Sequence, residues 1–180
     1  MELINNTTKT LKDDLLVEIK KGSKLSIAAA CFSIYAFQEL KKQLTSIEEL
    51  RFIFTSPTFV AEKTKKEKRE FYIPRLNRER SLYGTEFEIK LRNEMTQKAI
   101  AKECADWIKE KVTFKSNISD KTIQGQLVVD DTGYTPINNF TTVELGCEKG
   151  NVISTTIVKD QSLAQTLIRD FNEIWNDKKV

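Results

Sequence analysis

The sequence predicts an α/β domain built on a mixed, mainly parallel sheet with helices on both faces. Segments of helical periodicity alternate with short apolar segments along most of the 180 residues, and strands joined by crossover helices need a helical layer on each face. The composition, 39% hydrophobic and 31% charged with six Gly and three Pro, is that of a globular chain. We expect one domain over residues 1–180.

The first sixty residues predict helix, strand, helix, strand. Leucine and isoleucine recur at helical spacing over residues 11–19, and KKGS then supplies two cations and a glycine typical of a helix C-terminus. KLSIAAACF is a nearly continuous apolar run, which favours a strand covered on both faces. One helical stripe follows over residues 34–47, and LRFIF predicts a second buried strand.

The second half continues the alternation. An apolar stripe predicts a long helix from near Glu88 to Lys111, and VTFK and IQGQLVV predict two strands after it. VISTTIV, residues 152–158, predicts a further strand. The closing helix is introduced by Asp160 or Ser162 as its N-cap.

Missing residue types exclude several kinds of chemistry. The chain has no histidine, which removes the commonest general base, the commonest zinc ligand and the phosphohistidine nucleophile. Cys31, Cys104 and Cys147 are odd in number and match no zinc spacing, so we expect reduced thiols. Neither a P-loop nor a dinucleotide-binding glycine motif occurs. We expect no cofactor and no metal.

Two neighbouring carboxylates leave an alternative open. Asp130 and Asp131 follow a predicted strand and could hold magnesium together with a third acidic group. The residues DDTG are also typical of a solvated turn, which is the simpler interpretation.

The chain shows no targeting or membrane signal. It has no apolar run of the roughly 20 residues that span a bilayer, and MELINNTTKTLKDDLL lacks the pattern of a signal peptide. We therefore expect a cytoplasmic protein without membrane contact.

Positive charge is concentrated in one segment. Between Lys63 and Arg80 there are eight basic and three acidic residues, a local charge of +5, whereas the whole chain carries +3 and the remainder therefore −2. Such concentration is the electrostatic footprint of phosphate-backbone binding. The eight cations, our candidate DNA-binding residues, are Lys63, Lys65, Lys66, Lys68, Arg69, Arg75, Arg78 and Arg80.

Residues 60–83, which contain these cations, predict a protruding basic insertion. Phe71, Tyr72 and Tyr83 are interleaved with the charges, and aromatic rings beside cations can stack on exposed bases. A solvated loop whose aromatic residues dock on the core is the alternative, because charge runs are commonly solvated.

Four segments together resemble a known family. KLSIAAACFSIYAFQELKKQL, LRFIFTSP, QKAIAKECADWIKEKVTFKS and RDFNEIWND resemble the phospholipase D-like domain at the N-terminus of bacterial superfamily-2 helicases of the chromatin-remodeller type. The resemblance spans nearly the whole chain. It implies a single phospholipase D-like half, followed in the same polypeptide by a C-terminal helicase motor.

The resemblance also locates a degenerate catalytic motif. Active members carry His-x-Lys-x-x-x-x-Asp at the end of a strand and a later Asn-containing segment, in which histidine attacks phosphorus and lysine and asparagine hold the phosphate. The matching positions here are Gln124, Gln126, Asp131 and Asn139. A glutamine amide neither attacks phosphorus nor supplies a cation, so the resemblance implies a vestigial site. Without the resemblance, QLVVDD is equally a core strand ending in a turn.

Three functions follow as hypotheses. The first is a catalytically silent accessory domain that binds DNA or positions the helicase motor, whose parent protein is then a helicase or ATPase. The second is a phosphodiesterase or nuclease, for which the histidine is missing. The third is a protein-interaction domain without nucleic-acid contact. Family members with one motif per chain often build their site across a two-fold dimer, so the resemblance also implies a homodimer.

Overall fold

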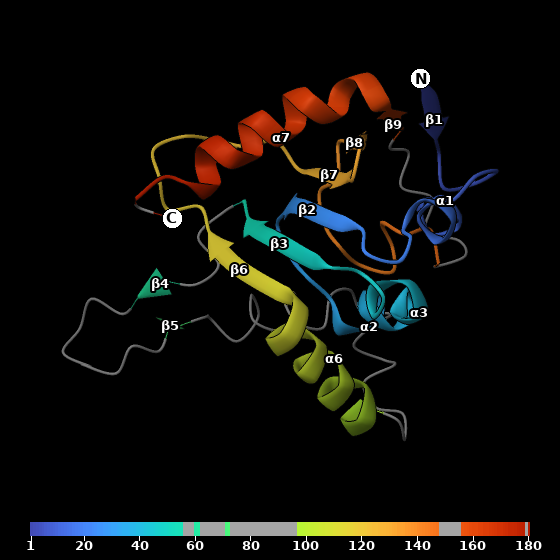
Figure 1. The fold of residues 1–180 in the computed structure, drawn as a ribbon, viewed down its shortest axis with the longest axis horizontal. Helices are drawn as coiled ribbons and strands as arrows, with labels where there is room; N and C mark the ends of the chain where they lie inside the picture. The colour runs from blue at the N-terminus through green and yellow to red at the C-terminus, as the bar shows by residue number, and fades with distance from the viewer. Residues whose placement is uncertain (56–59, 62–70, 73–96, 148–155, 179) are drawn as a thin grey trace.

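A seven-stranded mixed sheet organises the computed structural model, which describes residues 1–55, 60–61, 71–72, 97–147, 156–178 and 180 (Figure 1). The strand order is β1-β9-β8-β7-β2-β3-β6. The strands are β1 (Glu2–Ile4), β2 (Lys24–Ala29), β3 (Glu49–Phe54), β6 (Val112–Ser116), β7 (Gln126–Val129), β8 (Thr132–Thr135) and β9 (Ile157–Asp160). The helices are α1 (Leu11–Glu18), α2 (Ile34–Glu39), α3 (Lys41–Leu44), α6 (Gln97–Lys111) and α7 (Gln161–Trp175).

The expected α/β class is confirmed, but the expectation of a mainly parallel sheet is wrong. Only β2–β3 and β3–β6 pair in parallel; β1–β9, β9–β8, β8–β7 and β7–β2 are antiparallel. The parallel strands are those joined by connections that contain helices. β7 and β8 are instead joined by a two-residue hairpin at Asp130 and Asp131, and a hairpin forces antiparallel pairing.

Helices lie on both faces of the sheet (Figure 1). α7 crosses one face, where Phe171 and Ile174 pack on Ala28 and Ile53 from the two central strands. The opposite face is covered by α1, α2, α3 and α6, which enclose the larger core. A sheet with apolar side chains on both sides needs both layers to exclude water.

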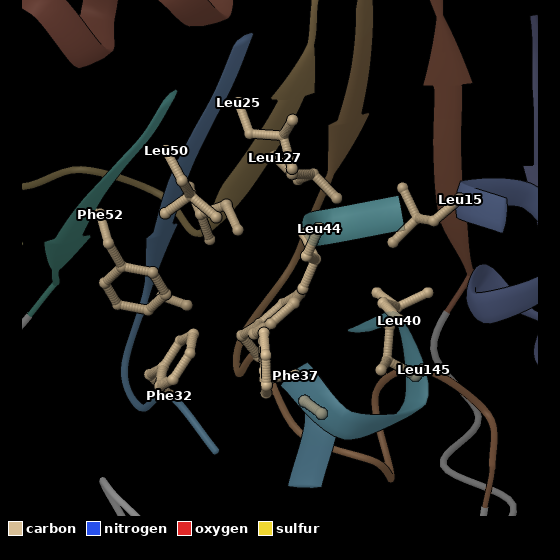
Figure 2. Close-up of a cluster of buried hydrophobic side chains, with 14 of the residues drawn as sticks. Leu15, Leu25, Phe32, Phe37, Leu40, Leu44, Leu50, Phe52, Leu127 and Leu145 are labelled. Carbon is tan, nitrogen blue, oxygen red and sulfur yellow. The ribbon is translucent and has the colours of Figure 1, made fainter. Parts of the chain in front are cut away.

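The larger core joins leucines to a group of aromatic rings (Figure 2). Phe32 stacks on Phe140 at 5.5 Å between ring centroids and meets Phe52 edge to face at 5.6 Å. Trp107 of α6 packs against Phe37 at 4.7 Å. Apolar burial on this scale is the main force holding the helices to the sheet.

Several element boundaries differ from the sequence expectations. The stripe over residues 34–47 forms two short helices, α2 and α3, that meet at Leu40. α1 ends at Glu18, and Gly22 after it adopts φ +79°, which suits glycine. Asp160 rather than Ser162 caps α7, since its side chain accepts from the Ser162 N–H. The expected beginning of the long helix near Glu88 and most of VISTTIV lie outside the described residues.

The predicted basic insertion, residues 60–83, is described only at two short strands. β4 (Val60–Ala61) and β5 (Phe71–Tyr72) pair antiparallel in a separate two-stranded sheet. Over the described part of the chain, no helix has the length and apolarity needed to cross a membrane.

Candidate functional site

Gln126, the first residue of β7, is a buried structural residue. Its side chain is only 2% exposed, and its Nε2 donates a hydrogen bond of 2.7 Å to the backbone oxygen of Leu167 in α7. A buried amide needs such a partner to offset its desolvation. Gln126 thus ties the sheet to the helix above it.

A groove of about 300 Å³ opens beside this contact. It lies between α7 and the segment that leads into β7, and it holds Gln124 and Gln126 together. Its lining residues are Lys121, Thr122, Ile123, Gln124, Gln126, Leu167, Asp170, Glu173 and Ile174. The groove is therefore the candidate functional site on which two of the four motif positions converge.

Gly125, between the two glutamines, permits a close approach of the backbone. A Cβ at this position would lie 1.9 Å from the carbonyl oxygen of Ile137, and the Ile137 N–H donates to the Gly125 oxygen at 3.0 Å. The segment that contains Asn139 consequently runs beside Gly125. Only glycine fits here, because any side chain would collide with the neighbouring backbone.

Asp131 lies away from the groove. Gln126 begins β7, whereas Asp131 is exposed in the hairpin after the strand has ended. The carboxylate of its neighbour Asp130 accepts two hydrogen bonds at the start of β2, from the Ser23 hydroxyl at 2.7 Å and from the Lys24 N–H at 2.9 Å. The structure therefore does not bring Asp131 together with the glutamines. Asp130 and Asp131 form the turn of the hairpin, whereas Thr132 and Gly133 already belong to β8.

Asn139 lies near the C-terminal end of β2, where it contacts Cys31 and Glu144. Its Oδ1 accepts from the Cys31 thiol at 3.2 Å, and its backbone N–H bonds to the carboxylate of Glu144. Glu144 is 5% exposed. Burial raises the pKa of the Glu144 carboxyl to about 7, and the Asn139 N–H offsets this only in part.

The charges of the groove do not suit a phosphate group. Lys121 pairs with Glu173 at 2.9 Å, and the further carboxylate of Asp170 makes the lining net negative. Phosphate binding depends on cations and N–H donors. The residues brought together here thus offer acceptors, the two amides of Gln124 and Gln126 and a paired lysine, and no nucleophile with an adjacent base.

Sequence reasoning missed a buried ionic network near the N-terminal end of α7, away from the groove. Asp14 of α1 is 6% exposed and accepts from the Tyr134 hydroxyl at 2.5 Å and from Lys159 Nζ at 3.0 Å. Lys159 also bonds Glu18 at 2.7 Å, and Lys9 bonds Asp14 at 3.1 Å. Burial raises the pKa of Asp14, but these hydrogen bonds outweigh burial and lower it. No spacing in the sequence signals a set drawn from α1, β8 and β9.

A second unpredicted feature is a pair of half-buried cations at the C-terminal end of α7. Arg51 stacks over Phe171 at 4.9 Å and donates to Asn172 at 2.9 Å. Lys115 lies 4.7 Å above the Trp175 ring and donates to that residue's carbonyl at 2.9 Å. Within the described residues, neither cation has a carboxylate partner within 4 Å.

The eight predicted DNA-binding cations of the Lys63–Arg80 segment all lie outside the described residues. In the parts of the chain that are described, no three metal-ligating side chains gather into a possible metal site. The fold and the groove define an α/β domain in which Gln124 and Gln126 line a polar groove, Asp131 lies in a distant hairpin and Asn139 contacts Cys31 and Glu144.

No protein-family model matches the chain, and a search of curated proteins finds no match.

We predict that Gln126→Glu destabilises the fold at alkaline pH. The substitution places a carboxylate oxygen against the Leu167 carbonyl and removes the donor, a loss of about 2–4 kcal/mol in the free energy of unfolding. At acidic pH the protonated side chain can donate again, so stability should partly recover. Urea denaturation at the two pH values measures this effect. The control is Gln124→Glu, the same change at an exposed position nearby. Equal losses of stability at both positions would contradict the structural role of the Gln126 hydrogen bond.

We predict that Glu144 makes stability depend on pH. Its folded pKa of about 7 lies above the ordinary value of 4.5, so the unfolded state loses its proton first. The contribution of Glu144 to stability therefore falls as pH rises from about 4.5 to about 7. Glu144→Gln should gain stability relative to the unmodified protein across this window, as measured by urea denaturation. The exposed change Glu110→Gln should not, and parallel pH profiles for Glu144→Gln and the unmodified protein would refute the burial argument.

Proposed function

We propose that this chain is a catalytically silent, phospholipase D-like accessory domain that binds the phosphate backbone of DNA and positions a helicase-type motor in the same polypeptide. The resemblance in four segments motivates the family and the motor. The structure supports this proposal at two points, the motif positions and the distribution of charge.

The motif positions support catalytic silence. The amide of Gln126 holds α7 to β7, and Asp131 lies at the far end of the strand. The phosphohistidine route also needs a histidine, and the chain has none. A phosphoryl-transfer site needs its nucleophile and its charge-stabilising groups within contact of one phosphorus atom.

The observation that carries the DNA-binding proposal is the placement of charge. Five of the eight cations, Lys63, Lys65, Lys66, Lys68 and Arg69, fall in the connection between the paired strands β4 and β5. Everything outside the Lys63–Arg80 window sums to −2. A basic connection between two strands, on an otherwise slightly acidic domain, is suited to contacting phosphates.

The Arg51 and Lys115 pair offers a second cationic contribution. Both side chains lie on the face of the sheet that carries α7, and each is held by an aromatic ring and a polar acceptor. Both cations are already hydrogen-bonded within the protein, and their positive charge adds to the electrostatic potential of this face.

We predict salt-dependent DNA binding that depends on the basic connection. Fluorescence anisotropy with labelled duplex and single-stranded DNA should show an affinity that falls steeply as salt rises, because phosphate contacts release counterions. Replacing Lys65, Lys66 and Arg69 with Glu should weaken binding about tenfold or more and flatten the salt slope by about three.

The matched control carries the same charge change on exposed lysines elsewhere, Lys20, Lys21 and Lys42 replaced with Glu. It should bind with nearly the affinity of the unmodified protein. Negligible binding at low salt, or equal losses in both triple variants, would overturn the DNA-binding proposal.

A further inference from the structure

A turn at residues 141–147, here called the docking turn, holds the beginning of helix α1. The backbone N–H of Lys12 donates to the Leu145 oxygen at 3.0 Å, and the side-chain amide of Asn6 donates to the Glu144 oxygen at 2.9 Å. The first N–H groups of a helix have no partner within the helix itself. The N-terminal end of α1 therefore depends on the docking turn for its hydrogen bonds.

Asn6 is fitted closely against the docking turn. Its Oδ1 accepts from the Leu11 N–H at 2.8 Å, and a Cβ on Gly146 would lie 2.9 Å from that same Oδ1 and 3.0 Å from the side chain of Thr10. Gly146 also adopts φ +79°, which favours glycine. The turn and the segment before α1 thus have matched surfaces, and a movement of one disturbs the other.

Thr141 and Glu144 close the docking turn in the manner of a capping box. The Glu144 N–H donates to Thr141 Oγ1 at 3.4 Å, and the Leu145 N–H donates to the Thr141 oxygen at 3.0 Å. The Glu144 carboxyl group reaches back along the chain and accepts from the Asn139 N–H. Reciprocal bonds of this kind between a threonine and a glutamate three residues later fix a turn. The Glu144 side chain therefore holds the docking turn closed from the inside.

The Glu144 carboxyl group is buried without a cation. The residue is 5% exposed, and within the described residues only burial and the Asn139 N–H act on its ionisation. The cations of the N-terminal segment are paired elsewhere, Lys12 with Glu39 and Lys9 with Asp14. The titratable side chains on the elements around the turn are Lys9, Lys12, Asp13 and Asp14 from the N-terminal segment and α1, Cys31 after β2, Tyr35 and Glu39 from α2, and Cys147 of the turn itself. A buried carboxylate with one donor and no cation is costly, which favours its protonated form.

We propose that Glu144 is a pH-sensitive switch: its protonated carboxyl group keeps the docking turn on the beginning of α1, and its ionised form releases that contact. Opening the turn gives the charge access to water, and it breaks the bonds that Lys12 and Asn6 donate to the turn. An exposed glutamate has a pKa near 4.5, and the docked one has a pKa of about 7. The open form therefore gains on the docked form as pH rises between these two values, and it gains no further above them. The proposal does not rest on DNA binding.

The test is hydrogen exchange of the Lys12 backbone amide followed by NMR, because the bond from this amide to Leu145 is part of the contact itself. Its protection factor, corrected for the intrinsic pH dependence of exchange, should fall about tenfold per pH unit between about pH 5 and pH 7 and level off above about pH 8. Glu144→Gln keeps an acceptor for the Asn139 N–H but cannot titrate, so its protection factor should not change with pH. Glu110→Gln, at an exposed position of α6, should behave as the unmodified protein does.

Urea at concentrations below the unfolding transition separates local release from global unfolding. The amide of Phe52, a fully buried residue in the middle of β3, should lose protection steeply with urea, because global unfolding exposes a large surface. The Lys12 amide should respond little, since opening of the docking turn exposes few residues. Equal urea dependence at both amides, or a Lys12 amide that is already unprotected at about pH 5, would overturn the proposal. A fall in Lys12 protection with pH that persists in Glu144→Gln, or its absence from the unmodified protein, would also overturn it.

Discussion

Strand β2 is the constraint on which the rest of the structure depends. Five of its six residues are buried, and it pairs in parallel with β3 on one side and antiparallel with β7 on the other. Before its first residue, Ser23 bonds Asp130 of the hairpin. Beyond its last residue, Phe32 forms a parallel bridge with Phe140. The parallel and antiparallel parts of the sheet meet at this strand, and both helical layers are needed because it has apolar side chains on each face.

This arrangement gives the segment from Gln124 to Asp131 a structural role that does not depend on catalysis. β7 must pair along β2, so its first and last residues are held at opposite ends of that strand. Gln126 contributes a hydrogen bond to α7 at one end, and the hairpin after β7 returns the chain as β8 at the other end. Each of these roles is structural and needs no nucleophile. The groove formed beside Gln126 has a net negative lining, which does not suit a phosphate group.

The sequence predicted the buried elements well because their signals are local. KLSIAAACF and LRFIF are apolar runs and form neighbouring strands. Residue type limited the N-cap of the last helix to Asp160 or Ser162, and the structure shows Asp160 in that role. β8 was missed because TGYT has no alternating apolar pattern and follows turn residues. The prediction of a mainly parallel sheet was wrong for the same reason. A hairpin strand that is not recognised changes the direction in which its neighbours pair.

The polar features of the fold depend on contacts between distant parts of the chain. Tyr134 and Asp14 are 120 residues apart, and Gln126 meets Leu167 across 41 residues. Neither pair has a spacing that sequence reasoning can recognise. Gln124 and Gln126 could be singled out from the sequence, but their convergence on a groove with Asp170 and Glu173 required the packing of α7 on the sheet.

We propose, as the central claim, that the segment from Gln124 to Asp131 carries no phosphodiesterase chemistry. A cleavage assay of the purified, unmodified protein with a generic phosphodiester substrate tests it most directly. The account predicts no turnover above that of a buffer blank. Turnover that survives purification and is abolished by Asp131→Ala would contradict it, because a residue at the far end of β7 would then have to act on phosphorus.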